Sequence, residues 1–170
     1  LATAAGAYRS LPTLAEQALR SAAASIGLEK DAAQLVSRLT SLPLYPDAEP
    51  GLDALSGERL AVLSNGTEEG LRELLSNAGI FDRFEHVLAA DTVGRYKPAP
   101  EVYGLAPRAF GVPPEEVVLV SSNDWDAAGA KLAGLRSVWV SRGRPLAPVL
   151  DTPPDHVVDD LTGIAFALGR

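Results

Sequence analysis

The chain has 170 residues, of which 46% are apolar and 22% charged, and this balance argues against a disordered protein. Its length suits one domain, or one domain with a small appendage. The 15 basic and 22 acidic residues give a net charge of −7, which argues against binding to nucleic acid or to an anionic membrane. No apolar stretch reaches the roughly 18–20 residues of a membrane span. The absence of Cys excludes disulfides and thiolate metal sites.

The N-terminal part of the chain has the pattern of a helical hairpin. The chain opens at Leu1 and contains no Met, so we expect a processed chain or a fragment. Apolar residues at helical spacing predict helices over 11–27 and 31–42. Three Pro residues and a Gly follow between positions 43 and 51, and we expect a linker there because such a stretch cannot continue a helix.

After Gly51 the pattern changes to short apolar runs that alternate with helical segments. We expect helices at 68–78, 100–110, 127–133 and 161–168, and strands at 59–63, 86–90, 117–120, 137–140 and 156–158. These strands are apolar throughout, and they alternate with helices. Both features predict a parallel sheet covered on both faces, and therefore an α/β fold.

Polar residues gather directly after three of the predicted strands, where ligands bind in open α/β sheets. The residues are Ser64 and Asn65, then Lys97, then Ser121, Asn123, Trp125 and Asp126. Taken singly, each has a simpler explanation: a helix cap for Ser64, Asn65 or Asp126, a solvated charge for Lys97 and packing for Trp125. Their convergence on one sheet edge favours an active site.

Other common site patterns are absent from the sequence. It contains no glycine-rich dinucleotide loop, no P-loop and no serine in a nucleophile elbow. The two histidines, His86 and His156, fall on predicted strands, and we expect them to be core or edge residues.

Three segments resemble the second, third and fourth motifs of the haloacid dehalogenase superfamily. They are Leu-Ser-Asn-Gly-Thr at 63–67, Tyr-Lys-Pro-Ala-Pro-Glu-Val-Tyr at 96–103 and Val-Ser-Ser-Asn-Asp-Trp-Asp at 120–126. More narrowly, they resemble the type II (L-)2-haloacid dehalogenases. The resemblance implies a Rossmann-like core with a parallel sheet over 46–170, and a partial α-helical cap over 1–45.

One detail of the fourth motif separates dehalogenases from phosphatases. Phosphatases of the superfamily carry a Gly-Asp pair whose carboxylate helps to hold Mg²⁺, and this sequence has Ser121-Ser122 at that place. A hydroxyl there removes an anionic oxygen ligand that Mg²⁺ prefers. We therefore expect a metal-independent enzyme with no cofactor.

The resemblance implies covalent catalysis on a small 2-haloacid. In the family, an aspartate displaces halide from C2 and forms an ester, which water then hydrolyses. Ser64 and Asn65 would bind the substrate carboxylate and halide, and Lys97 would neutralise and position the nucleophile. Tyr103 and Trp125 would shape the substrate pocket.

The residues after the 117–120 strand complete the expected site. Ser121 and Asn123 would hydrogen-bond the nucleophilic carboxylate, and Asp126 would orient Lys97 and help to activate water. Asp124 stands where relatives carry a small residue, which predicts a different substrate pocket.

The family's nucleophilic Asp and its halide-binding Arg precede every residue of this sequence. We therefore expect the chain by itself to be inactive. The first strand of the family is central, so its absence would leave two sheet edges unpaired. Each buried backbone group without a partner costs roughly 1–3 kcal/mol, so we expect an upstream segment or a partner strand to fill the place.

Two other functions stay open. One is a hydrolase of the superfamily that acts on a fluoroacid or a small phosphate ester. The other is a non-catalytic HAD-like binding protein. We expect a cytoplasmic protein without nucleic-acid or membrane partners. We also expect a homodimer formed through the cap, which presents Leu11, Leu14 and Leu35.

Overall fold

The computed structural model describes residues 3–25, 41–145 and 149–169. The chain divides into two compact units. The first contains Leu1–Pro43 and Ala61–Tyr96, and the second contains Leu44–Leu60 and Lys97–Arg170.

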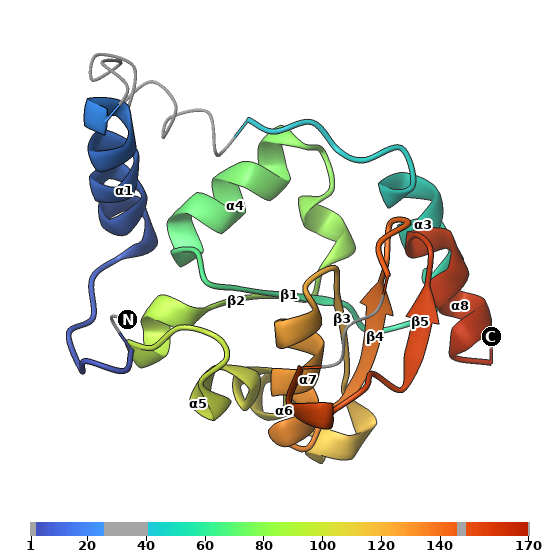
Figure 1. Ribbon diagram of the computed structural model, residues 1–170. Helices are drawn as coiled ribbons and strands as arrows, with labels where there is room; N and C mark the ends of the chain where they lie inside the picture. The colour runs from blue at the N-terminus through green and yellow to red at the C-terminus, as the bar shows by residue number, and fades with distance from the viewer. Residues whose placement is uncertain (1–2, 26–40, 146–148, 170) are drawn as a thin grey trace. The chain divides into compact units, whose positions relative to one another are not determined.

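The first unit contains a pair of parallel strands and the helix that joins them. Strand β1 pairs with β2, and the register places Ala61 beside His86 and Ser64 beside Ala89. Helix α4 packs against β2 and follows β1 in the chain (Figure 1). The elements are α1 (Leu11–Ser25), β1 (Ala61–Ser64), α4 (Glu68–Asn77), η3 (Phe81–Arg83), β2 (His86–Ala89) and η4 (Ala90–Val93).

The second unit contains a three-stranded parallel sheet in the order β3-β4-β5. Helix α7 packs against β3 and β4, and α8 packs against β5 (Figure 1). The elements are α3 (Ala48–Ala54), α5 (Pro100–Tyr103), α6 (Leu105–Phe110), η5 (Pro114–Glu116), β3 (Val118–Ser121), α7 (Asp124–Leu132), β4 (Arg136–Val140), η6 (Val149–Asp151), β5 (His156–Val158), η7 (Leu161–Gly163) and α8 (Ile164–Ala167).

Burial explains why the central strand of this sheet is apolar. Val138 of β4 is fully buried and belongs to a core cluster with Leu55 and Ile164. Trp139 and Val140 are also buried, so side chains on both faces of β4 are covered. This agrees with the prediction of a parallel sheet covered on both faces, and the α/β fold is confirmed.

The predicted strands match the observed ones to within two residues, and His86 and His156 lie on strands as expected. The predicted helix over 100–110 is instead divided at Gly104. Pro107 explains the division, because in a continuous helix its ring would clash with the carbonyl of Tyr103. A restart at Leu105 places Pro107 in a first turn, where its missing N–H is not needed.

The stretch after Pro43, which we expected to be a linker because it cannot continue a helix, contains a short helix of its own. Helix α3 spans Ala48–Ala54 in that stretch. Pro50 is its third residue, so the N–H that proline lacks is one that the first turn leaves unpaired in any case. Gly51 allows α3 to pack closely, since a Cβ atom there would lie 2.6 Å from Leu161 Cβ. Of the N-terminal hairpin, α1 is observed, whereas 26–40, which includes most of the predicted second helix, lies outside the described residues.

In the described residues, the outer strands of both sheets have an edge without a strand partner, and these include β1 and β3. Within the ranges that the structure describes, β1 pairs with β2 alone and β3 pairs with β4 alone. Each of these two strands therefore has an edge with no strand partner there. In the same ranges, no helix is both long and apolar enough to cross a bilayer.

Candidate active site

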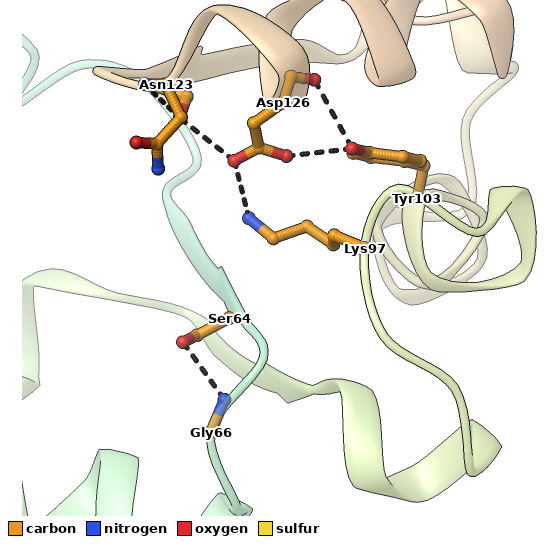
Figure 2. A network of polar contacts seen from close by, with 7 residues as sticks. Ser64, Gly66, Lys97, Tyr103, Asn123 and Asp126 are labelled. Carbon is orange, nitrogen blue, oxygen red and sulfur yellow. Dashed lines mark hydrogen bonds and ion pairs between the residues drawn. The ribbon is translucent and has the colours of Figure 1, made fainter. Parts of the chain in front are cut away.

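A buried ion pair joins two of the residues singled out from the sequence. The Lys97 ammonium lies 2.7 Å from Asp126 Oδ2 (Figure 2). The exposed fractions of the two side chains are 10% and 3%, so both charges are largely removed from water. Such charges are tolerated only when they neutralise each other and make further hydrogen bonds.

Two more side chains complete the surroundings of the Asp126 carboxylate. Ser121 Oγ donates to Asp126 Oδ2 over 2.9 Å, and the Tyr103 hydroxyl donates to Oδ1 over 2.8 Å. Both oxygens of the buried carboxylate therefore accept hydrogen bonds (Figure 2). The arrangement holds the Lys97 ammonium in one position at the carboxyl end of β3.

The local sequence after β3 explains how Asp126 reaches this position. Strand β3 ends at Ser121, and Asn123 is the N-cap residue of α7, so Asp126 lies in the first helical turn. The N–H of Asn123 donates to Ser121 Oγ over 3.2 Å, which links the strand end to the helix start. The predicted helix start at Ala127 is three residues too late, because the cap position was assigned to Asp126. The Asp126 carboxylate instead binds side chains from other elements.

Tyr103 is fully buried, and burial raises the pKa of its hydroxyl. The Asp126 carboxylate raises that pKa further. Tyr103 therefore stays protonated at neutral pH and can donate permanently to Asp126. The pairing of Tyr103 with Asp126 was not anticipated from the sequence, in which the two residues are 23 positions apart.

Ser64 and Asn65 belong to the first unit, directly at the end of β1. Ser64 Oγ accepts a hydrogen bond from the Gly66 N–H over 3.2 Å (Figure 2). The interpretation of either residue as the helix cap is wrong, because Thr67 is the N-cap of α4 and its Oγ1 accepts from the Gly70 N–H.

Trp125 and Asp124 lie in the first turn of α7. Trp125 has an exposed fraction of 37%, and its N–H donates to Asp124 Oδ1 over 2.7 Å. These contacts are local to the helix start. The expected contribution of Trp125 to a substrate pocket stays a prediction.

The carbonyl of Ser122 is held by side chains that sequence reasoning missed. Trp139 Nε1 donates to it over 3.3 Å, and the Arg144 guanidinium also donates to it. The Arg144 guanidinium lies 5.8 Å from the centre of the Trp139 ring. Residues of β4 and of the loop after it therefore hold the loop between Ser121 and Asn123. The position of Trp139 next to this loop follows from the pairing of β4 with β3, which the sequence does not show.

A metal site was not expected from the sequence, and that expectation stays a prediction. In the described ranges, no three His, Cys, Asp or Glu side chains are grouped so that they could hold an ion. The positive charge next to Asp126 is instead the ammonium of Lys97.

Comparison with known proteins decides the family. The model of the haloacid dehalogenase-like hydrolases matches residues 4–134. The chain belongs to this family. Haloacetate dehalogenase H-2 of Moraxella sp. (strain B) is 36% identical over 142 residues, which are 82% of this chain and 63% of that protein.

Two further relatives have different activities in their names. The structure of L-2-haloacid dehalogenase from Xanthobacter autotrophicus, with chloropropionic acid covalently bound, matches with a TM-score of 0.91 and 30% identity, over 99% of this chain and 79% of that one. Phosphoserine phosphatase of Thermus thermophilus is 44% identical over 129 residues, 74% of this chain and 51% of that protein. The chain thus spans between about half and four fifths of these family members.

Proposed function

We propose that the whole protein to which this chain belongs hydrolyses a small 2-haloalkanoic acid through an aspartyl-ester intermediate. The observation that carries this proposal is the Lys97–Asp126 ion pair, buried and held by Ser121 and Tyr103 at the end of β3. A buried ammonium at this place suits a reaction in which a neighbouring carboxylate must stay ionised and attack carbon. The structural relative with covalently bound chloropropionic acid supports the same chemistry.

The roles follow from the contacts and from the family resemblance. Lys97 attracts the nucleophilic carboxylate, and Asp126 keeps the Lys97 ammonium in place and helps to activate the hydrolytic water. The side-chain amide of Asn123 hydrogen-bonds the nucleophile, and Ser121 would do so by turning its one hydroxyl proton from Asp126 Oδ2 toward it. Tyr103 holds Asp126, and Trp125 borders the substrate.

Two groups of residues rest on the resemblance alone. Ser64 and Asn65 bind the substrate carboxylate and the halide in this proposal. In this proposal, residues outside this sequence supply the nucleophilic Asp, at the end of a strand, and the halide-binding Arg, in the early part of the cap. The chain by itself would then be inactive.

We also propose that the reaction needs no metal ion. Ser121-Ser122 occupies the place of the metal-binding Gly-Asp pair of phosphatases, and a serine hydroxyl is a poor substitute for a carboxylate as a ligand of Mg²⁺. A cytoplasmic location and a homodimer formed through the cap stay predictions.

A second candidate is the hydrolysis of a small phosphate ester. The 44% identity to a phosphoserine phosphatase favours it. It would require Mg²⁺, whereas the proposed dehalogenase would not. Metal dependence therefore separates the two candidates.

The experiment uses the chain extended to its natural start. Halide release is measured from each enantiomer of 2-chloropropanoate in the presence of EDTA, and phosphate release from phosphoserine is measured with Mg²⁺. Halide release from the L-enantiomer supports the proposal. Phosphate release with no halide release establishes the second candidate, and no release in either assay points to a non-catalytic role.

A matched pair of lysine variants tests the site itself. Lys97→Ala should lower kcat by about 10³-fold, because it removes a charge that acts on the reacting groups. Lys131→Ala removes an ammonium of the same unit that pairs with Asp155 and is 29% exposed, and kcat should change by less than about twofold. Equal activity of the two variants would contradict the assignment of Lys97.

A further inference from the structure

Gly129 lies on the buried side of α7, one helical turn after Asp126. A Cβ atom at this position would lie 2.4 Å from the Tyr103 hydroxyl oxygen and 3.0 Å from Tyr103 Cε2. It would also lie 3.0 Å from Pro98 Cβ. Real Cβ atoms do not approach other heavy atoms to 2.4 Å, so any side chain at Gly129 requires a neighbour to move.

The backbone of Gly129 does not itself require glycine. Gly129 lies inside an α-helix, where Ala is the better helix former. Its neighbours Ala127, Ala128 and Ala130 are buried residues of the same helix. The missing side chain therefore serves the close approach of another segment rather than the conformation of α7.

The two residues that Gly129 meets come from the segment that carries the catalytic lysine. Pro98 directly follows Lys97, and Tyr103 is the donor to Asp126 Oδ1. Asp126 binds Lys97 and Tyr103 at the same time, at 2.7 Å and 2.8 Å. Both contacts require α7 to lie close to the segment from Lys97 to Tyr103, and Gly129 is the residue of α7 at that approach.

We propose that Gly129 is a positioning residue, which sets the distance between α7 and the Lys97–Tyr103 segment and thereby keeps Asp126 bonded to both. The part of this inference that concerns activity rests on the proposed function. Tyr103 is fully buried and cannot rotate into solvent to avoid a methyl group. A methyl group therefore lengthens the Tyr103–Asp126 hydrogen bond, which weakens steeply with distance and angle.

The test is a double-mutant cycle in the whole protein, with Gly129→Ala, Tyr103→Phe and the combination. Gly129→Ala should lower kcat for the haloacid by about 10- to 100-fold, the usual consequence of a displacement of about 1 Å in a catalytic group, while KM changes by less than about twofold. Tyr103→Phe removes the oxygen that the new methyl group would meet at 2.4 Å. The double variant should therefore have a higher Tm than Gly129→Ala, and its kcat should fall less below that of Tyr103→Phe than the kcat of Gly129→Ala falls below that of wild type.

A merely structural role for Gly129 predicts a different result. Suppose that Gly129 contributes only to the packing of α7 and does not position Asp126. The two substitutions then lower kcat by independent factors that multiply, or Gly129→Ala leaves kcat unchanged at temperatures where the protein is folded. Either outcome overturns the inference. Gly57→Ala is the matched control, because a Cβ atom at Gly57 meets nothing within 4 Å and kcat should stay constant.

A second readout does not depend on activity. Acylation of lysines by an amine-reactive ester, followed by peptide mass spectrometry, should label Lys97 faster in Gly129→Ala than in wild type, because the Lys97 side chain is only 10% exposed when it is paired. Lys131, on the same helix, is the internal reference. An equal increase at Lys131 would mean general loosening of α7 and would overturn the inference. If the protein has no activity but Lys97 alone is labelled faster in Gly129→Ala, the inference about Gly129 still holds and only the proposed function fails.

Discussion

Two ion pairs of the second unit join the same kinds of charge in different ways. Arg142 binds Asp47 through its two terminal guanidinium nitrogens, each 3.0 Å from a carboxylate oxygen, and the Leu161 N–H donates to Asp47 Oδ2 over 2.8 Å. Lys97 binds Asp126 through one oxygen, and the side chains of Ser121 and Tyr103 supply the other donors. The first pair ties the start of α3 to the loops after β4 and β5, whereas the second collects side chains at the end of β3.

The difference in donors indicates a difference in role. A planar guanidinium fork fixes a carboxylate in one geometry and suits a structural contact. The Arg142 guanidinium also lies 4.1 Å from the centre of the Tyr45 ring. A lysine ammonium is a compact charge that can act on a second anion. We therefore expect substitutions at the Lys97 pair to reduce activity and substitutions at the Arg142 pair to reduce stability.

Asp126→Asn should have the largest effect. The amide keeps the shape of the side chain but loses the charge that holds the Lys97 ammonium, so kcat should fall by roughly 10³-fold, within the range for general acid–base groups. Halide release by the whole protein measures the effect, with Asp155→Asn as the control for loss of a paired aspartate. A kcat within about threefold of wild type would remove Asp126 from the mechanism.

Arg142→Ala should instead lower the free energy of unfolding. The substitution leaves the Asp47 carboxylate, with an exposed fraction of 9%, without its cation. We expect a loss of about 2–3 kcal/mol, below the range for fully buried pairs because Arg142 itself is 26% exposed. Urea unfolding followed by tryptophan fluorescence measures the loss, and kcat of the folded protein should stay unchanged.

Arg142→Lys sharpens this prediction. The variant keeps the positive charge but loses the second parallel hydrogen bond, so the loss of stability should be intermediate. A stability equal to that of wild type would show that charge alone, and not the guanidinium fork, holds Asp47.

Acid should weaken the same contact. The hydrogen bonds from Arg142 lower the pKa of Asp47 below its ordinary value of 3.8. Because the folded-state pKa lies below the unfolded one, the contact stabilises the fold above the unfolded pKa and loses this effect as the pH falls through the folded pKa. The free energy of unfolding should therefore fall as the pH drops below about 5, roughly one unit above the unfolded-state pKa, and continue to fall through the folded pKa, less steeply in Arg142→Ala.

Asp155 contributes to the same acid sensitivity. Its burial acts to raise the pKa, but hydrogen bonds from Lys131 and the Ser137 N–H outweigh that effect, and the pKa is lowered. Asp155→Asn should remove this part of the pH dependence. An identical acid profile in wild type, Arg142→Ala and Asp155→Asn would contradict both assignments.

Arg72→Ala should have the smallest effect. Arg72 pairs with Glu68 one turn away on α4, and the two side chains are 50% and 46% exposed. Such exposed helical pairs contribute about 0.3–0.5 kcal/mol, less at high salt. Urea unfolding at low and high ionic strength measures this contribution to the free energy of unfolding. A loss above 1 kcal/mol would mean that the exposed fraction of the side chains does not predict how much an ion pair of this protein stabilises the fold.

The sequence predicted which residues gather at the site better than it predicted which of them bind each other. Lys97, Ser121 and Asp126 were expected near each other because they follow strands of a parallel sheet, and the structure brings these three together. The donor role of Tyr103 was missed, because a residue 23 positions away on another helix gives no local pattern. The cap roles assigned to Ser64, Asn65 and Asp126 were wrong, since Thr67 and Asn123 occupy those positions.

The sequence by itself determined the alternation of apolar strands and helices, the α/β class and the polar residues at the strand ends. These are local properties, because burial on both faces demands continuous apolar runs and parallel strands demand crossover helices. Tertiary structure alone decided that a proline-rich stretch forms α3 against Leu161, that Tyr103 donates to Asp126 and that a Cβ atom at Gly129 would meet the Tyr103 hydroxyl. Each depends on how closely two segments distant in sequence approach, and packing at that scale is set by the atoms of both partners.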